Sequence, residues 1–176
     1  MTPTVVDDLK QYVRLIPDFP KKGILFRDIT TLLLDAGAFK RAIDLLCREF
    51  ENKGIQKVIG VESRGFLTAA PLAYHLGAGL IPVRKRGKLP HDTHSVTYEL
   101  EYGVDTLEIH RDSIQPGDHV LVADDLLATG GTAKAACDLV EKSGGKVAGV
   151  AFLIELLDLK GKDKLKNHPV FSLIQY

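Results

Sequence analysis

Two adjacent carboxylates followed by a small glycine loop are the residues of this chain best suited to chemistry. Asp124 and Asp125 come directly after the apolar run 120–123, and a Thr-Gly-Gly-Thr loop at 129–132 leads into the helix-like run 133–142. Backbone N–H groups in such a loop and the partial positive charge of a helix start suit a phosphate monoester. Glycine allows close approach of the backbone because no side chain blocks the anion. The segment therefore predicts a phosphate site beside two acids.

This loop differs from the two common nucleotide loops, because it lacks the lysine of G-x-x-x-x-G-K-[ST] and the spacing of G-x-G-x-x-G. Acids directly before the loop indicate a sugar phosphate whose hydroxyls donate to the carboxylates, or a Mg²⁺ ion nearby. The structural alternative is an acid pair that caps the next helix, with Gly130-Gly131 as an ordinary turn.

A second anion site is indicated where another apolar run, 57–61, meets a helix-like run, 66–76. The connection holds Glu62, Ser63 and Arg64. A helix start and a guanidinium both attract an anion, so this turn suits a second phosphate. A capping turn with an exposed arginine is the alternative.

Four cations lie within five residues after the apolar run 80–83: Arg84, Lys85, Arg86 and Lys88. The chain has 23 Lys+Arg and 23 Asp+Glu, so its formal net charge is zero. General binding to nucleic acid or to an anionic membrane is therefore not favoured, and a local cluster must select any anion. We interpret Arg84, Lys85 and Lys88 as a pyrophosphate clamp, with a solvated basic face as the alternative.

An aromatic side chain, Phe26, lies in the segment 19–28 between residues whose backbone is free to read a ligand. An aromatic face can stack on a purine. Packing of this ring in the core is the alternative.

The apolar pattern predicts the elements that position these loops. Expected helices cover 5–15, 37–53, 66–76 and 133–142, expected strands cover 57–61, 80–83, 120–123, 146–154 and 171–174, a hairpin covers 95–109, and 84–90 and 160–168 are loops. Alternation of strands and helices over 176 residues predicts one α/β domain with a parallel sheet and right-handed crossovers. Loops that follow such strands meet at the carboxyl edge of the sheet, so the three polar loops should form one site.

The N-terminus has neither a basic start nor an apolar signal core, and no apolar run approaches the length of a membrane span. The two cysteines, Cys47 and Cys137, lie in amphipathic runs and are expected to be buried, reduced thiols. These features lead us to expect a cytoplasmic protein with no membrane partner. The pair His91 and His94 has no further obvious ligand nearby in sequence and is interpreted as a solvent-facing loop feature.

Six segments together resemble the adenine branch of the type I phosphoribosyltransferases: D-F-P-x-x-G-I-x-F-R-D-I, G-x-E-S-R-G-F, R-K-R-G-K-L-P, Y-E-L-E-Y-G, V-A-D-D-L-L-A-T-G-G-T and F-S-L-I-Q-Y. They span residues 17–176. The resemblance implies an α/β type I phosphoribosyltransferase fold, with a central, mostly parallel sheet flanked by helices, a hairpin lid and a small N-terminal hood. It implies one domain, 1–176, in which 1–30 is the hood and base-binding segment and 84–110 a flexible basic loop and hairpin.

The same resemblance implies purine salvage: adenine and phosphoribosyl pyrophosphate (PRPP) give AMP and pyrophosphate, with Mg²⁺ held mainly through PRPP near Asp124 and Asp125. Phe26 would stack on adenine, and the backbone at Leu25 and Arg27 would read its edge. The 5′-phosphate would lie on Ala128, Thr129, Gly130, Gly131 and Thr132, and the ribose hydroxyls on the acid pair.

The resemblance also implies a pyrophosphate site formed by Ser63 and Arg64 with Arg84, Lys85 and Lys88. Arg64 would neutralise the leaving group, and the Glu62–Ser63 peptide would be cis. Glu101 would act as the acid/base near purine N7, and Tyr102 would close the lid. The family often has Asp at the position of Glu62, which we interpret as a minor variation.

Two other functions compete with this one. A phosphoribosyltransferase for another purine would keep the PRPP chemistry and change the base pocket. A non-catalytic PRPP- or purine-sensing regulator would use the same fold, although the chain has no spare length for a DNA-binding module and no net positive charge. The resemblance further implies a homodimer in which Arg84 reaches the neighbouring subunit.

Overall fold

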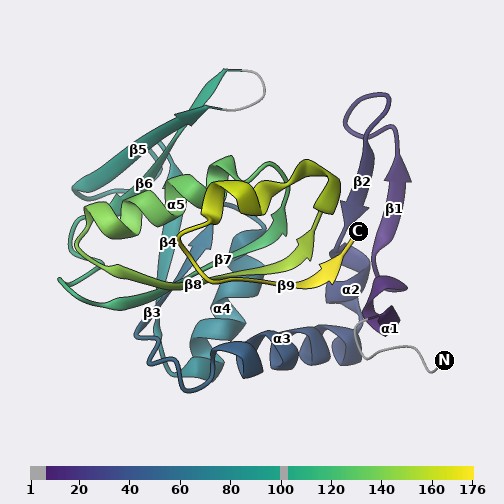
Figure 1. Cartoon of the computed structure of the whole chain (residues 1–176), viewed down its shortest axis with the longest axis horizontal. Coiled ribbons are helices and arrows are strands. Elements are labelled where there is room, and N and C mark those ends of the chain that lie inside the picture. The colour runs from purple at the N-terminus through teal and green to yellow at the C-terminus, as the bar shows by residue number, and fades with distance from the viewer. Residues whose placement is uncertain (1–6, 100–102) are drawn as a thin grey trace. The chain divides into compact units, whose positions relative to one another are not determined.

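The computed structural model describes residues 7–99 and 103–176, which form two compact units, one within Met1–Leu45 and one within Leu46–Tyr176 (Figure 1). The boundary falls inside helix α3 (Ala36–Phe50). Each unit has its own sheet, a two-stranded one in the first and a seven-stranded one in the second.

The N-terminal unit is built around a β-hairpin. Its elements are α1 (Asp7–Lys10), β1 (Arg14–Pro17), β2 (Leu25–Asp28), α2 (Thr30–Leu34) and the first part of α3. The expected helix over 5–15 is wrong: the helix ends at Lys10, and 14–17 pair antiparallel with 25–28. The ladder of backbone hydrogen bonds outweighs a helical spacing that a short apolar run satisfies only partly.

Strand β2 is held at both ends by side-chain contacts to the backbone. In the turn before it, Asp18 Oδ1 accepts the N–H of Gly23 at 2.7 Å. At its other end the buried Asp28 accepts the N–H of Thr30 at 2.9 Å and the hydroxyl of the same residue at 2.8 Å. The middle of the strand, Phe26 and Arg27, is therefore fixed between two tethered ends.

The second unit carries a sheet in the order β5-β6-β4-β3-β7-β8-β9. The strands are β3 (Lys57–Val61), β4 (Gly79–Lys85), β5 (Thr93–Glu99), β6 (Val104–His110), β7 (His119–Leu127), β8 (Lys146–Glu155) and β9 (Val170–Gln175). From β4 to β9 the neighbours are parallel, whereas β5 and β6 form an antiparallel hairpin joined to β4. The expected mostly parallel sheet, the hairpin and the last edge strand are confirmed.

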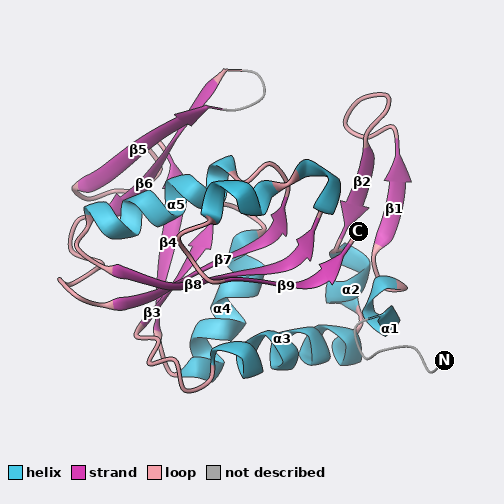
Figure 2. Cartoon of the chain, viewed as in Figure 1, coloured by secondary structure: helices cyan, strands magenta, loops and turns pink. Residues whose placement is uncertain are grey.

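Two crossovers leave the centre of the sheet in opposite directions. Helix α4 (Gly65–Leu76) connects β3 to β4, and α5 (Gly131–Lys142) connects β7 to β8. Because crossovers are right-handed, the two helices lie on opposite faces of the sheet. In Figure 2, α5 lies above β8, whereas α4 runs behind the strands and continues below β8. Ligands of such sheets bind where the strand order reverses, here between β3 and β7.

The central strands are buried on both faces and supply the core. Its members include Ile59, Val61, Val83, Val122, Val150 and Phe152. Continuous apolar runs are what parallel strands covered by helices require. Small side chains on α5 (Ala133, Ala135, Ala136 and Cys137) bring that helix close to the sheet. Cys47 and Cys137 are buried free thiols, as expected.

Three boundaries differ from the sequence prediction. Strand β7 does not end before the acids but continues to Leu127, because the long strand β8 offers it a ladder as far as Glu155. Arg84 and Lys85 belong to β4 rather than to a loop. The expected polar loop 160–168 contains a 3₁₀ turn, η2 (Gly161–Leu165), preceded by η1 (Leu157–Leu159). Within 7–99 and 103–176, no helix is both long and apolar enough to span a membrane.

Candidate active site

The phosphate loop lies between the end of β7 and the start of α5. Gly130 adopts a left-handed conformation (φ 79°) as the residue before the helix, and its carbonyl accepts the N–H of Lys134 at 3.0 Å. The loop surrounds a hollow of about 80 Å³ that is lined by Asp124 and residues 126–133. A helix start of this kind presents free N–H groups to an anion, as the sequence predicts.

A second backbone supports this loop from behind. A Cβ at Gly130 would collide with the carbonyl oxygen of Gly161 in η2, and a Cβ at Gly161 would collide with the carbonyl of Ala128. Both glycines are therefore required by backbone packing, and the shape of the phosphate loop depends on the turn that follows β8.

Sequence reasoning missed two side chains beside this loop. The ammonium of Lys164 lies 3.9 Å from where a Cβ on Gly131 would be, and it forms no ion pair among the described residues. From the hairpin, Tyr98 receives a hydrogen bond from the hydroxyl of Thr132 at 3.3 Å. The signal for Lys164 was its position after β8, because the carboxyl ends of parallel neighbours share one edge.

The acid pair lies at the switch point between β3 and β7. Asp125 is 5% exposed, and its Oδ2 lies 2.9 Å from Nε of Arg64, the residue just before α4. Asp124 Oδ1 accepts the N–H of Asp125 at 2.9 Å. A Cβ on Gly65 would come within 2.6 Å of the same oxygen, so only glycine lets α4 begin this close to the acids. The structure thus brings Arg64 and both aspartates together.

The surroundings of this pair disfavour negative charge. Burial raises the pKa of Asp124, and the neighbouring Asp125 carboxylate raises it further. Burial also raises the pKa of Asp125 by more than the Arg64 guanidinium lowers it. Ribose hydroxyls or a cation placed against these acids would compensate for the lost solvation.

Glu62 does not lie open to an incoming anion but pairs with the basic segment. Its side chain is 10% exposed, and the peptide to Ser63 is cis, as expected. Its carboxylate lies 3.3 Å from Nε of Arg84, accepts the backbone N–H of Lys85 at 3.1 Å and is in contact with the ammonium of Lys88. Burial acts to raise the pKa of Glu62, but the hydrogen bonds from Lys88, the Lys85 backbone and Arg84 together lower it to about 2.

The third cation of the expected clamp turns toward the hairpin instead. Lys85 Nζ lies 2.9 Å from Asp105 on β6, a contact that raises the pKa of Lys85 and lowers that of Asp105. Glu108 on the same strand accepts the N–H of Gly87 at 2.8 Å. The structure therefore brings Arg84 and Lys88 together around Glu62 and places the Lys85 side chain apart from them.

The expected base-binding residues lie on β2 of the N-terminal unit. Phe26 is half-buried and meets Phe19 edge to face, with ring centroids 5.1 Å apart. Arg27 Nη1 donates to the carbonyl of Leu25 at 2.5 Å, so one of the expected backbone groups already has a partner. Glu101 and Tyr102, the expected acid/base and lid residues, lie outside the described residues.

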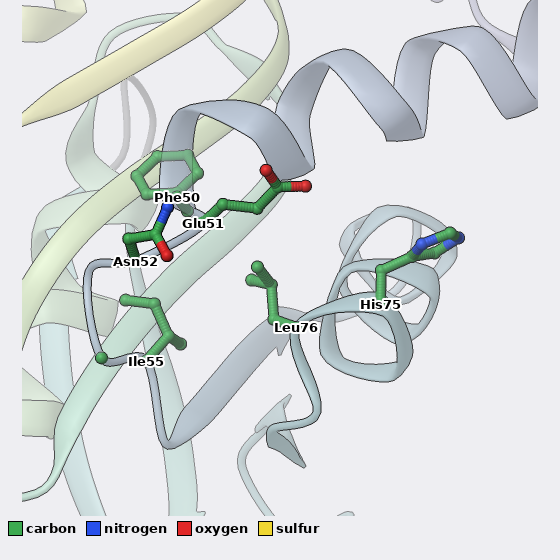
Figure 3. A pocket seen from close by; sticks show the side chains of 7 residues that line it. Phe50, Glu51, Asn52, Ile55, His75 and Leu76 are labelled. Carbon is green, nitrogen blue, oxygen red and sulfur yellow. The ribbon is translucent and has the colours of Figure 1, made fainter.

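A larger hollow of about 390 Å³ in the second unit lies away from the phosphate loop (Figure 3). It is lined by Phe50, Glu51, Asn52, Gly54, Ile55, His75 and Leu76. These residues precede β3 and β4, so the hollow faces the amino edge of the sheet, whereas the phosphate loop follows β7 at the carboxyl edge. It contains none of the residues that sequence analysis singled out.

Comparisons with known proteins agree on one family. The family model described as phosphoribosyl transferase domain matches residues 30–175. The adenine phosphoribosyltransferase of Chloroflexus aurantiacus is 58% identical over 96% of this chain and 98% of its own. The solved adenine phosphoribosyltransferase of Thermoanaerobacter pseudethanolicus superposes with a TM-score of 0.94 at 51% identity, covering 97% of this chain and 99% of its own.

A third relative was solved with ligands. The Saccharomyces cerevisiae adenine phosphoribosyltransferase, complexed with D-2,5-dideoxy-2,5-imino-altritol 1,6-bisphosphate and adenine, is 43% identical. It has a TM-score of 0.91 and covers 96% of this chain and 98% of its own.

The raised pKa of Asp124 predicts that its charge opposes folding. A carboxyl whose pKa is higher in the folded state binds its proton more tightly there, so stability increases as pH falls toward that pKa. Asp124→Asn removes the charge and keeps the oxygen that accepts the Asp125 N–H. We therefore expect the unfolding free energy of the ligand-free protein at neutral pH to rise, as measured by urea denaturation.

The matched comparison is Asp125→Asn, which also removes a carboxylate whose pKa burial raises but in addition takes away an ionic partner of Arg64, so it should stabilise the protein less than Asp124→Asn. Loss of stability in Asp124→Asn would show that its charge is compensated in the folded protein.

Proposed function

The chain belongs to the adenine phosphoribosyltransferase family, and we propose from this that it transfers the phosphoribosyl group of PRPP to adenine, giving AMP and pyrophosphate. The observation that supports this best is the position of the acid pair, the phosphate loop and Arg64 at one switch point of the sheet. A ligand with one phosphate, two vicinal hydroxyls and a second anionic group matches that arrangement.

The sugar phosphate occupies the end of β7 in this proposal. Residues 128–132 bind the 5′-phosphate through backbone N–H groups and the hydroxyls of Thr129 and Thr132. Asp124 and Asp125 accept hydrogen bonds from the ribose hydroxyls. Donation by these hydroxyls stabilises the charged form of acids whose pKa burial raises.

The pyrophosphate binds across the turn after β3 and the basic segment. Arg64 and the exposed Ser63 contact it from the turn, and Arg84, Lys85 and Lys88 contact it from the basic segment. Their charges stabilise the negative charge that develops on the leaving oxygen as the bond from C1′ breaks. Arg64 must exchange at least part of its contact with Asp125 for the incoming anion.

Magnesium fits this site as part of the PRPP complex. Among the described residues no group of three or more His, Cys, Asp and Glu side chains could hold a metal. Two adjacent carboxylates and the phosphate oxygens of a substrate are nevertheless a donor set that Mg²⁺ accepts. Asp124 and Asp125 would help to hold such an ion, which would neutralise charge on the leaving pyrophosphate.

Adenine is placed by the N-terminal unit in this proposal. Phe26 stacks on the purine, and backbone groups at Leu25 and Arg27 read its edge. The guanidinium of Arg27 already donates to the Leu25 carbonyl. Adenine therefore binds this carbonyl only if the Arg27 side chain moves; otherwise it binds N–H groups of the strand. The yeast relative was solved with adenine, which supports this choice of base.

The reaction is a substitution at C1′ of the ribose. The bond from C1′ to the pyrophosphate oxygen breaks with its electron pair leaving on that oxygen, adenine N9 forms the new bond to C1′, and the proton that the purine gives up passes to the carboxylate of Glu101. Glu101 serves as the acid/base beside purine N7. Tyr102 and the hairpin that carries it exclude water from the cation-like centre.

A second copy of the chain is the partner that we propose for the exposed apolar face of α4 and β4. On α4, Leu67 and Tyr74 are 47% and 86% exposed and lie two helical turns apart on one side. On β4, Leu80 is 48% exposed, and Arg84 lies on the same face of the strand. A dimer through this face would bring Arg84 of each subunit to the interface.

The substrate prediction is tested with a panel of bases. With PRPP and Mg²⁺, we expect nucleotide formation from adenine and none above background from hypoxanthine, guanine or xanthine. The products are measured by chromatography. Turnover of another base would keep the PRPP chemistry and contradict the assignment of the base pocket. Binding of PRPP without turnover of any base would favour the sensor.

The acid/base prediction is tested with Glu101→Gln, which keeps the size of the side chain and removes its charge. We expect kcat to fall about 10²-fold with little change in KM for adenine or PRPP, because proton transfer by a positioned group contributes about 10²–10⁴-fold. Steady-state kinetics decide the matter, and an unchanged kcat would remove Glu101 from the mechanism.

The dimer prediction is tested by sedimentation. Wild-type protein should sediment as a dimer, and Leu67→Glu should shift it toward monomer and lower activity, because a charge would be buried in an apolar interface. Leu159→Glu provides the control, since Leu159 in η1, which follows β8 on the other side of the sheet order, is exposed to the same extent as Leu67, 47%. A wild-type monomer with full activity would contradict the proposal.

A further inference from the structure

The carboxylate of Glu62 lies inside a nearly complete anion site. The guanidinium of Arg84 approaches it through Nε at 3.3 Å and Nη2 at 3.4 Å, the backbone N–H of Lys85 donates to it at 3.1 Å, and the ammonium of Lys88 contacts its other oxygen. Both carboxylate oxygens are therefore occupied by donors from a single turn of the chain. Two cations and a backbone N–H around one anion are the usual elements of a phosphate site.

The turn itself is folded around this carboxylate. Arg84 Nη1 donates to the carbonyl of Lys88 at 3.2 Å, and the N–H of Lys88 donates to the carbonyl of Lys85 at 3.3 Å. Gly87 is left-handed (φ 79°), which the turn requires. Without an anion at its centre, the turn would hold two like charges close together, so Glu62 stabilises its conformation.

We propose that Glu62 is a positioning residue that takes the place of pyrophosphate in the free enzyme, keeping Arg84 and Lys88 arranged and leaving them when pyrophosphate binds. This inference rests on the proposed function, because Arg84 and Lys88 are the cations assigned there to pyrophosphate. Nothing in that assignment required an acid of the chain to occupy the same donors.

The consequence is a competition within the site. A pyrophosphate group has more negative charge and more acceptor oxygens than one carboxylate, so it displaces Glu62. The return of Glu62 to the same donors after the reaction offsets part of that attraction and favours product release. Pyrophosphate affinity therefore depends on how much more strongly Arg84 and Lys88 bind pyrophosphate than they bind Glu62. Removing the charge of Glu62 should strengthen pyrophosphate binding.

The test is Glu62→Gln, which keeps the length of the side chain and removes its charge. By calorimetry we expect the Kd for pyrophosphate to fall about three- to tenfold, within the range known for partly buried ion pairs. The Kd for AMP, which lacks a pyrophosphate group, should stay within about twofold, since an effect confined to one group leaves other contacts in place. A merely structural role of Glu62 would instead weaken both ligands together.

Glu108→Gln is the matched control. It removes one negative charge beside the same turn, but Glu108 contacts the Gly87 N–H and Gln can still accept that bond. We expect its pyrophosphate Kd to stay within about twofold of wild type, because the buried Glu108 binds the Gly87 N–H and not the donors that we assign to pyrophosphate.

An unchanged or increased pyrophosphate Kd in Glu62→Gln would overturn the inference. If that variant does not fold, a crystal structure of wild-type protein with pyrophosphate decides: Glu62 separated from Lys88 supports the inference, and Glu62 still paired with Lys88 overturns it. Failure of the proposed function is recognised separately, because wild-type enzyme would then form no AMP from adenine and PRPP.

Discussion

The ion pair between Arg64 and Asp125, 2.9 Å from Nε to Oδ2, is the interaction on which the rest of the site depends. It connects the turn after β3 to the end of β7, the two neighbours between which the strand order reverses. Charges brought together at a partly buried sheet edge are costly unless each has a partner. The three cations of the expected pyrophosphate clamp follow the same rule, since Glu62 holds Arg84 and Lys88 and Asp105 holds Lys85. An anionic sugar phosphate therefore enters this site by exchanging partners with acids of the chain.

The acids of the site serve two different purposes. Hydrogen bonds keep Glu62 ionised, with a pKa of about 2, so its charge is present at any physiological pH. Burial has the opposite effect on Asp124 and Asp125 and raises their pKa values. The ion pairs of Glu62 stabilise the free enzyme. The unfavourable burial of Asp124 and Asp125 is compensated further when a ligand brings hydrogen-bond donors or a cation. Part of the substrate's binding free energy thus comes from compensating the burial of these two carboxylates in the ligand-free protein.

Much of the fold could be predicted from the sequence, because the buried central strands are continuous apolar runs that periodicity detects. The three polar loops were recognised for the same reason, as each follows such a run. The N-terminal hairpin was missed because Val13 and Ile16 also fit a helical spacing, and only the ladder between β1 and β2 decides between the two.

Lys164 and Tyr98 were missed because they reach the phosphate loop through strand order, which no local pattern reveals. The sequence places Glu62 next to Ser63 and Arg64 and so predicts that its turn binds an anion. In the structure, the carboxylate of Glu62 is itself the anion that Arg84 and Lys88 bind. The roles of Glu101 and Tyr102 came from resemblance to a family and stay predictions.

A crystal structure of the protein with AMP would test the central claim most directly, that the end of β7 and the start of α5 bind a sugar phosphate. We predict the phosphate on the backbone N–H groups of 128–132, the ribose hydroxyls on Asp124 and Asp125, and no phosphate contact from Arg84 or Lys88. AMP bound with its phosphate in the basic turn, or away from the acid pair, would contradict this account.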